Sequence, residues 1–292
     1  MQLRFFSTDF GFQATGADIG NDLLYEIDNV IGGGAGDTIN GNQFANALSG
    51  RGGNDTLSGS IGADRLDGGT GADRMTGGID SDTYVVDNAG DVVDELADGG
   101  DGAADLVFSS VSFSLADTVH VKGTVENLTL TGAGNISGSG TGGANAITGN
   151  GGANTIKGGG GIDAIDGGAG NDLLYGHTGN DSLKGGAGLD KFVFSTALGS
   201  TNVDKILDFN VASDTVYLAR SIFTRAGANG TLSTAAFHKG TSAADASDRI
   251  VYDQAAGKIY YDPDGTGAAS KVLFATVTPG TALTNADFHI FG

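Results

Sequence analysis

The chain has 292 residues, of which 35 are acidic and 15 basic, so its formal net charge is −20. This balance argues against nucleic acid or an anionic membrane surface as a partner, because neutralising phosphates requires lysine and arginine, and it makes cations the natural partners. The absence of cysteine excludes disulfides and thiolate metal sites. No stretch approaches the roughly 18 apolar residues of a membrane span, and an apolar content of 39% argues against disorder despite the 53 glycines.

Residues 1–27 precede the first repeat and are expected to form an N-terminal cap. They contain one arginine, no sustained apolar core and no small-residue cleavage site, so we expect no amino-terminal secretory signal. They are also too few for a catalytic domain.

A nine-residue repeat runs through residues 28–93, the first repeat block. Counted from Gly32, each unit opens with glycine, its sixth place is Asp or Asn, and its eighth place is apolar. The sixth places are Asp37, Asn46, Asp55, Asp64, Asp73 and Asp82. The eighth places are Ile39, Leu48, Leu57, Leu66, Met75 and Tyr84.

This spacing excludes a helix, because an apolar residue every nine positions produces no stripe with a 3.6-residue period. It fits a three-residue strand centred on the eighth place, whose middle side chain points inward. The glycine-rich residues between strands would form turns. Two units would then make one coil of 18 residues, and successive coils would stack in parallel on a ladder of apolar side chains.

Residues 94–134 interrupt the repeat and are expected to form a short β linker. They begin inside an acidic run, residues 91–105, which we interpret as a solvated loop, with an extra cation site as the alternative. Apolar residues then alternate with polar ones and indicate a few short strands. These apolar positions are Leu106, Phe108, Val111, Phe113 and Leu115.

The repeat resumes in the same phase in the second repeat block, residues 135–193. Its sixth places are Asn145, Asn154, Asp163, Asp172, Asp181 and Asp190. Its eighth places are Ile147, Ile156, Ile165, Leu174, Leu183 and Phe192. His177 falls at a variable place of one unit and is expected to be exposed and inert.

Residues 194–292 carry alternating apolar segments without the repeat and are expected to form a C-terminal β cap. Such a cap would cover the apolar edge that a stack of repeats leaves open. RIVYD and KIYYD, separated by QAAG, predict a β-hairpin. YYDPDGTG imitates the start of an EF-hand loop at Asp262 and Asp264, but Leu273 stands where that loop needs glutamate, so a hairpin turn is favoured over a calcium site.

Several units match the pattern GGxGxDxUx, and through them the chain resembles the RTX family of calcium-binding repeat proteins. Examples are GGTGADRMT at 68–76, GGAGNDLLY at 167–175 and GGAGLDKFV at 185–193. The resemblance implies an all-β fold with two parallel β-roll blocks, joined by the short β linker and followed by the C-terminal β capping region. It also implies export through a type I secretion machinery, whose signal region would lie within 194–292. The ending ADFHIFG is similar to such signals, with Gly292 as a departure.

The sixth-place residues are the candidate calcium ligands. Those 18 residues apart would stack into four columns, and stacked carboxylates repel unless a hard cation lies between them. Carboxylate and carbonyl oxygens favour Ca²⁺ over zinc or copper. Twelve residues in four columns give eight gaps between consecutive members, five of them Asp–Asp and three weaker ones Asn–Asp. The turn glycines expected to add carbonyl oxygens are Gly50, Gly52, Gly53, Gly68, Gly69, Gly71, Gly167, Gly168, Gly170, Gly185, Gly186 and Gly188. The alternative is that each Asp only hydrogen-bonds its own turn.

No catalytic residue and no organic cofactor site is expected, because neither HExxH nor GxSxG occurs. We therefore expect a secreted, extracellular calcium-binding protein that folds when it meets calcium and acts at a cell surface, in a matrix or towards a host. The alternative is a calcium-binding and secretion module of a larger extracellular hydrolase or polysaccharide-modifying enzyme, with polysaccharide as a partner. An ice-binding roll is not supported, because the third places carry no regular rank of Thr and Asn.

Overall fold

The computed structural model describes residues 4–8, 11–15, 22–23, 28–96 and 104–292. Most of the predicted N-terminal cap lies outside these residues, except for strands β1 (Arg4–Thr8), β2 (Gly11–Thr15) and β3 (Asp22–Leu23). The chain divides into two compact units, Met1–Thr131 and Gly132–Gly292. The finer division into cap, block, linker, block and C-terminal region stays a prediction.

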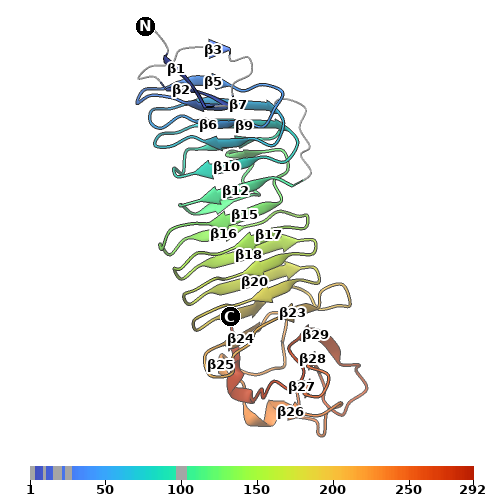
Figure 1. Cartoon of the computed structure of the whole chain (residues 1–292). Helices are drawn as coiled ribbons and strands as arrows, with labels where there is room; N and C mark the ends of the chain where they lie inside the picture. The colour runs from blue at the N-terminus through green and yellow to red at the C-terminus, as the bar shows by residue number, and fades with distance from the viewer. Residues whose placement is uncertain (1–3, 9–10, 16–21, 24–27, 97–103) are drawn as a thin grey trace. The chain divides into compact units, whose positions relative to one another are not determined.

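In the first unit the chain alternates between two sheets as it winds, so strands that are consecutive in the repeat lie in different sheets (Figure 1). One sheet has the order β1, β2, β4 (Asn29–Ile31), β6 (Ala47–Ser49), β8 (Arg65–Asp67), β10 (Thr83–Val86), β12 (Leu106–Ser109) and β15 (Asn127–Leu130). The other has the order β14 (Val121–Lys122), β11 (Val92–Asp94), β9 (Arg74–Ile79), β7 (Thr56–Ile61), β5 (Thr38–Asn40) and β3. The unit also contains β13 (Phe113–Ser114). After the antiparallel pair β1 and β2, the strands of both sheets pair in parallel.

The eighth place of each repeat forms the core, as the sequence predicts. Leu48 pairs in register with Leu66, and Leu57 with Met75, one coil on in each case. The eighth-place side chains of this unit are at most 1% exposed, whereas their neighbours along each strand are more exposed. Burying a side chain of this size stabilises the fold by roughly 1.5–3 kcal/mol, so the stacked ladder is the main apolar contribution of the repeat.

The second unit repeats this arrangement and then departs from it. One sheet has the order β17 (Ala146–Thr148), β19 (Ala164–Asp166), β21 (Ser182–Lys184), β23 (Asp204–Ile206), β29 (Val272–Thr276), β28 (Lys258–Tyr261), β27 (Ile250–Asp253) and β26 (Phe237–Lys239). The other has the order β16 (Ser137–Ser139), β18 (Thr155–Gly160), β20 (Leu173–Thr178), β22 (Lys191–Phe194), β24 (Thr215–Ala219), β30 (Phe288–Phe291) and β25 (Gly230–Thr231). Pairing is parallel as far as β29 and β30.

The last part of this unit contains the antiparallel strands β27, β28 and β29 and a buried cluster of aromatic side chains. β27 and β28 form the predicted hairpin, and β28 pairs antiparallel with β29, so the loop that begins at Asp262 is a hairpin connection as predicted. Phe274 lies edge-on to Phe194 and Phe223, with ring centroids 5.0 Å apart in both pairs. Phe223 and Phe274 are fully buried. Two short 3-10 helices, η1 (Thr234–Ala236) and η2 (Asn285–Asp287), complete the unit.

The all-β class and the parallel β-roll are thus confirmed. In the described parts of the chain no helix is long and apolar enough to cross a membrane. Two smaller predictions are wrong. The acidic run is not a solvated loop throughout, because Asp91, Asp94, Glu95 and Asp105 are each at most 4% exposed; residues 97–103 lie outside the described residues. His177 is half-buried rather than exposed, and its ring stacks on Tyr175.

Candidate metal sites

The sixth-place residues line up in columns at the turns, one member per coil. In each of the eight predicted pairs, one carboxylate oxygen of the later residue accepts a hydrogen bond from the backbone N–H of the earlier residue. The donor–acceptor distances lie between 2.6 and 2.9 Å. Asp55 Oδ1, for example, accepts from Asp37 N at 2.7 Å. These bonds fix the carboxylates at the coil boundary, where the sequence places them.

The second oxygen of each of these eight carboxylates is buried and has no hydrogen-bond donor among the residues that the structure describes. The atoms concerned are Oδ2 of Asp55, Asp64, Asp73, Asp82, Asp163, Asp172, Asp181 and Asp190. Burying an ionised oxygen without a partner is costly. Each column therefore contains acceptor oxygens that lack a positive partner among the described residues.

Each of these oxygens faces a space beside the first-place glycine of its own unit. A methyl group added at Gly50 would lie 2.1 Å from Asp55 Oδ2 and 2.7 Å from the carbonyl oxygen of Gly68, one coil on. At Gly167 the same methyl would lie 2.6 Å from both Asp172 Oδ2 and the carbonyl oxygen of Gly185. At each predicted gap between consecutive column members, glycine thus leaves a place where a side-chain oxygen and a carbonyl oxygen of consecutive coils converge.

Burial also raises the pKa of these carboxyl groups. It brings the pKa of Asp64, Asp82 and Asp172 to about 7 and that of Asp73 and Asp163 to about 6. The hydrogen bond that each carboxylate accepts from a backbone N–H lowers its pKa, whereas neighbouring carboxylates raise it further. A cation in the gap would counter both burial and repulsion, because it favours the ionised form.

The donors in a gap are carboxylate and carbonyl oxygens, which suit a hard cation such as Ca²⁺. The RTX calcium-binding nonapeptide repeat (4 copies) matches the chain over residues 31–66, 49–84, 58–93, 139–174 and 157–192. The chain contains RTX calcium-binding nonapeptide repeats. It is accordingly a calcium-binding β-roll, and the unpartnered oxygens and glycine-lined gaps fit that ion. No curated protein matches the chain closely enough to count as a relative.

The remaining turn glycines of the RTX repeats bring consecutive coils into close contact. Gly71, at φ 146°, lies so near the coil before it that an added methyl would be 1.6 Å from the carbonyl oxygen of Gly53. Gly188 has the same relation to Gly170. Positive φ values are found at Gly53, Gly69, Gly71, Gly168, Gly170, Gly186 and Gly188, and Gly52 pairs with Thr70 in an isolated bridge. All the predicted turn glycines thus lie at the boundaries between coils.

The first member of each RTX column differs from the others, because it bonds its own turn. Asp37 Oδ2 accepts from Gly33 N at 2.7 Å. The side-chain oxygens of Asn46, Asn145 and Asn154 accept from the backbone N–H four residues earlier. Four of the eight predicted gaps therefore begin with a side chain whose oxygen already has a donor, and the other four begin with one of the unpartnered carboxylates.

Each RTX column also extends one coil further than the sequence prediction. Asp91, Asp105, Asp204 and Asp214 accept from the backbone N–H of Asp73, Asp82, Asp181 and Asp190, at distances of 2.8 to 3.2 Å. The spacing is 18 residues for Asp91 but 23 or 24 for the other three, so the strict period misses them. Each is nevertheless followed, two positions on, by a fully buried apolar residue, as in the repeats.

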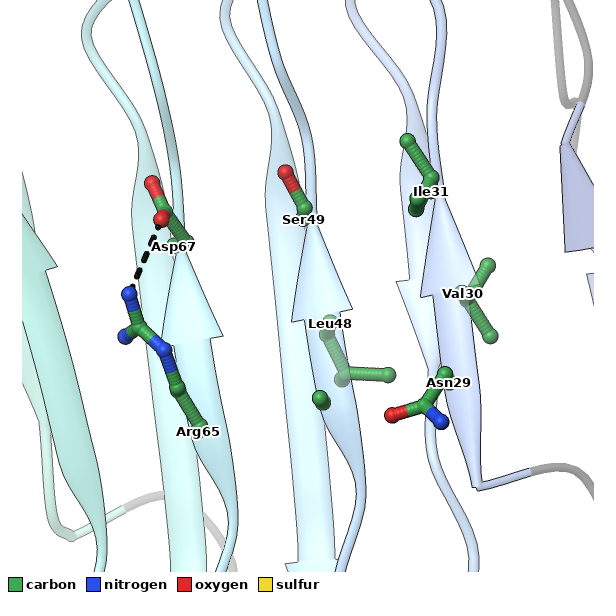
Figure 2. Close-up of a pocket in the computed structure, with 8 residues that line it drawn as sticks. Asn29, Val30, Ile31, Leu48, Ser49, Arg65 and Asp67 are labelled. Carbon is green, nitrogen blue, oxygen red and sulfur yellow. Dashed lines mark hydrogen bonds and ion pairs between the residues drawn. The ribbon is translucent and has the colours of Figure 1, made fainter. Parts of the chain in front are cut away.

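A pocket in the first unit lies on strands β4, β6 and β8 and includes none of the predicted calcium ligands. Figure 2 shows its lining from Asn29 to Asp67. Its charged groups, Arg65 and Asp67, form an ion pair with each other at 3.2 Å. The other lining side chains are apolar, hydroxyl or amide groups, and this set contains no nucleophile paired with a base.

Proposed function

We propose that this RTX protein is secreted and that extracellular Ca²⁺ drives its folding, after which it acts without catalysis at a cell surface, in a matrix or towards a host. The observation that carries the proposal is the set of eight buried carboxylate oxygens without a donor. In the absence of a cation these oxygens oppose folding, since burial disfavours their ionised form. The same oxygens favour folding when a cation joins them.

The ligands in this proposal are the twelve predicted sixth-place residues, the three successors Asp91, Asp204 and Asp214, and the first-place glycines. Bound Ca²⁺ would supply a positive charge that neutralises facing carboxylates and completes an all-oxygen shell with glycine carbonyls. Gly32, Gly41, Gly59, Gly77, Gly140, Gly149, Gly158 and Gly176 occupy the same first place as the glycines already predicted. Gaps that begin with Asp55, Asp64, Asp163 or Asp172 are the strongest predicted sites, because their oxygens are ionisable and lack a donor.

Thermodynamic linkage turns this binding into a folding switch. A ligand that binds only the folded chain stabilises it by RT ln(1 + [L]/Kd) at each site. Extracellular calcium modules typically have Kd values of about 10⁻⁴–10⁻³ M. The anionic chain would stay unfolded in a calcium-poor cytosol, pass through a type I secretion machinery, and fold outside the cell.

Contact with polysaccharide is a second candidate function, and one feature of the second unit favours it. Tyr175 of β20 stacks on His177, and Tyr217 of β24 stacks on His289, with ring centroids 5.4 and 4.7 Å apart. Lys157 and Lys191 lie over these two tyrosine rings. The four rings are only partly buried, so aromatic groups and lysine ammonium groups are accessible together to a sugar chain. This function would also suit a module of a larger extracellular enzyme.

A calcium titration tests the folding switch. The full chain is placed in chelator-treated buffer, and its far-ultraviolet circular dichroism is followed as Ca²⁺ or Mg²⁺ is added. A cooperative change from coil to β signal in the sub-millimolar to millimolar range, absent with Mg²⁺, is the expected result. A chelated chain with the same β signal as the calcium-loaded chain would contradict the proposal.

A further inference from the structure

Three buried carboxylates meet at the end of the first repeat block, outside the eight predicted gaps. Asp82 precedes β10, Glu95 follows β11 and Asp105 precedes β12. Each offers an oxygen atom, and these oxygens lie within 4.8 Å of one another. The three residues are at most 2% exposed. Such a concentration of buried negative groups is unfavourable unless something neutralises it.

Two oxygens in this cluster have no hydrogen-bond donor within the described segments, which omit residues 97–103. Asp82 Oδ1 accepts from the backbone N–H of Asp64, and Glu95 accepts from the hydroxyl of Tyr84 through its other oxygen, Oε1. Asp82 Oδ2 and Glu95 Oε2 are both buried without a donor. The cluster therefore presents two unpartnered acceptors beside a third carboxylate, Asp105.

The repeat register explains why these groups meet. Glu95 occupies the first place of a unit, where the preceding coils have Gly41, Gly59 and Gly77. In the repeats, the first-place residue gives only its backbone carbonyl to the gap. Here the first-place residue adds a side-chain carboxylate. This gap between Asp82 and Asp105 is therefore chemically different from the nonapeptide gaps.

Glycines on both sides keep space around the cluster. A methyl group added at Gly77 would lie 2.1 Å from both Asp82 Oδ2 and the Tyr84 hydroxyl. One at Gly123, in the following coil, would lie 2.6 Å from the Cβ of Glu95. Within the described part of the chain, no lysine or arginine forms an ion pair with any of the three carboxylates. The described side chains therefore neither occupy the space beside the three carboxylates nor neutralise their charge.

We propose that Asp82, Glu95 and Asp105 bind a divalent cation, in a site distinct from the RTX nonapeptide sites. Three carboxylates without a nitrogen or sulfur donor select a hard ion, and Ca²⁺ is the ion of this class that tolerates an irregular set of oxygens. With three formal negative charges the site should bind more tightly than gaps that combine two acidic side chains with backbone carbonyls. The proposal goes beyond the repeat function, because Glu95 and Asp105 belong to no matched nonapeptide.

The competing explanation is a protonated cluster without an ion. Burial raises the pKa of Glu95 to about 8, although the Tyr84 hydroxyl acts against this rise, so a neutral Glu95 could also persist at neutral pH. The two explanations differ for Glu95→Gln. Glutamine mimics the protonated acid, and it removes a charged ligand from a cation site.

The experiment counts ions and probes their position in the full chain. Wild type, Glu95→Gln, Tyr84→Phe and the control Asp87→Asn are loaded with Ca²⁺ and freed of loose ions by gel filtration, and bound calcium is measured by atomic emission. Asp87 is an exposed acid of the same segment, so its variant matches the charge change only. In a parallel measurement Tb³⁺ replaces Ca²⁺, and its emission is excited by energy transfer from tyrosine. The Tyr84 ring can act as the energy donor, because its hydroxyl contacts Glu95.

We expect Glu95→Gln to bind one ion fewer than wild type and to lose the Tyr84-dependent part of the Tb³⁺ emission. Tyr84→Phe should lose the same emission and keep the ion count, and Asp87→Asn should match wild type in both measurements. A Glu95→Gln chain with the full count and full emission overturns the proposal in favour of the protonated cluster. If Glu95→Gln does not fold, Tyr84→Phe decides, and unchanged emission from that variant overturns the proposal. A wild type that binds no calcium would sink the repeat function as well, so the two failures are distinguishable.

Discussion

Replacing Asp172 with asparagine should change stability in opposite directions with and without calcium. Asp172 Oδ1 accepts from Asn154 N at 2.8 Å, and Oδ2 is buried without a donor. Asparagine keeps the first acceptor. It also replaces the second oxygen with an N–H group beside the carbonyl oxygen of Gly185, which closes the same gap. In the calcium-free chain this replaces a buried oxygen that is ionised at pH 8 with a neutral group, which removes the cost of burying that charge without a partner.

The pKa of Asp172 gives the size of the effect without calcium. Burial raises it from 3.8 to about 7, which corresponds to at most about 4 kcal/mol for keeping the group ionised at pH 8. Screening by solvent near the turn reduces this to roughly 1–2 kcal/mol. With calcium present the sign reverses, because a site at 100 times its Kd contributes about 2.7 kcal/mol. The variant should lose most of that contribution.

The assay is urea unfolding followed by circular dichroism at pH 8, in chelator and in saturating calcium. If the chelated chain is unfolded, a series of osmolyte concentrations restores a measurable transition. Asp166→Asn is the matched control, because it removes the same charge from an exposed ion pair with Lys184 and should change stability by less than about 1 kcal/mol. A loss of stability for Asp172→Asn that is equal in chelator and in calcium would refute this reasoning, since Asp172 would then act through its hydrogen bond alone.

Three further predictions concern pH, the gaps and the C-terminal cap. The carboxyls of Asp64, Asp73 and Asp172 have pKa values raised to about 6–7 in the fold. The stability that they contribute to the calcium-free chain is therefore present below about pH 4 and lost as the pH rises through 6–7. Circular dichroism in chelator should show more β structure at pH 5 than at pH 8, and the reverse order would contradict the prediction. Gly167→Ala should cost roughly 1–3 kcal/mol of stability and weaken calcium binding, because its methyl would fill a gap. The control is Gly151→Ala, whose methyl would meet nothing within 4 Å and should change stability by less than about 0.5 kcal/mol. Calorimetry measures both variants. Phe274→Ala should cost roughly 3–5 kcal/mol in urea unfolding, because the Phe274 ring is fully buried between Phe194 and Phe223. The control is Phe44→Ala, which removes an exposed ring. A smaller loss of stability for Phe274→Ala than for this control would show that the cap does not stabilise the unit.

Much of the fold follows from the sequence because one local rule is repeated. A single apolar residue between two outward neighbours defines a short strand, and Leu57 and Leu174 lie fully buried where that rule places them. The position of the carboxylates follows from the same count. What the count cannot give is how each oxygen is used. Only the structure distinguishes Asp37, which bonds its own turn, from Asp55, whose Oδ2 has no donor among the described residues.

The residues that the sequence did not predict lie where loops interrupt the period. Asp105 and Asp204 continue their columns after 23 residues rather than 18. The local signal, an acid followed two positions on by Val107 or Ile206, was present in the sequence but out of phase. Glu95 had no such signal. Its burial depends on Tyr84 and on the coil that brings Asp105 beside it, and neither contact can be read from an acidic run.

Consecutive column members are usually 18 residues apart, but three pairs are 23 or 24 residues apart. This difference shows which parts of a coil can vary in length and which cannot. The extra five or six residues are inserted between strands, and the ladder continues beyond them in register. A duplicated or deleted whole coil would present the same edges to its neighbours as before, whereas one residue added within a strand would turn its apolar side chain to the opposite face. The protein can therefore evolve, and could be engineered, by adding or removing whole coils. Each coil adds one strand to each of two sheets and one member to each of two columns of carboxylates.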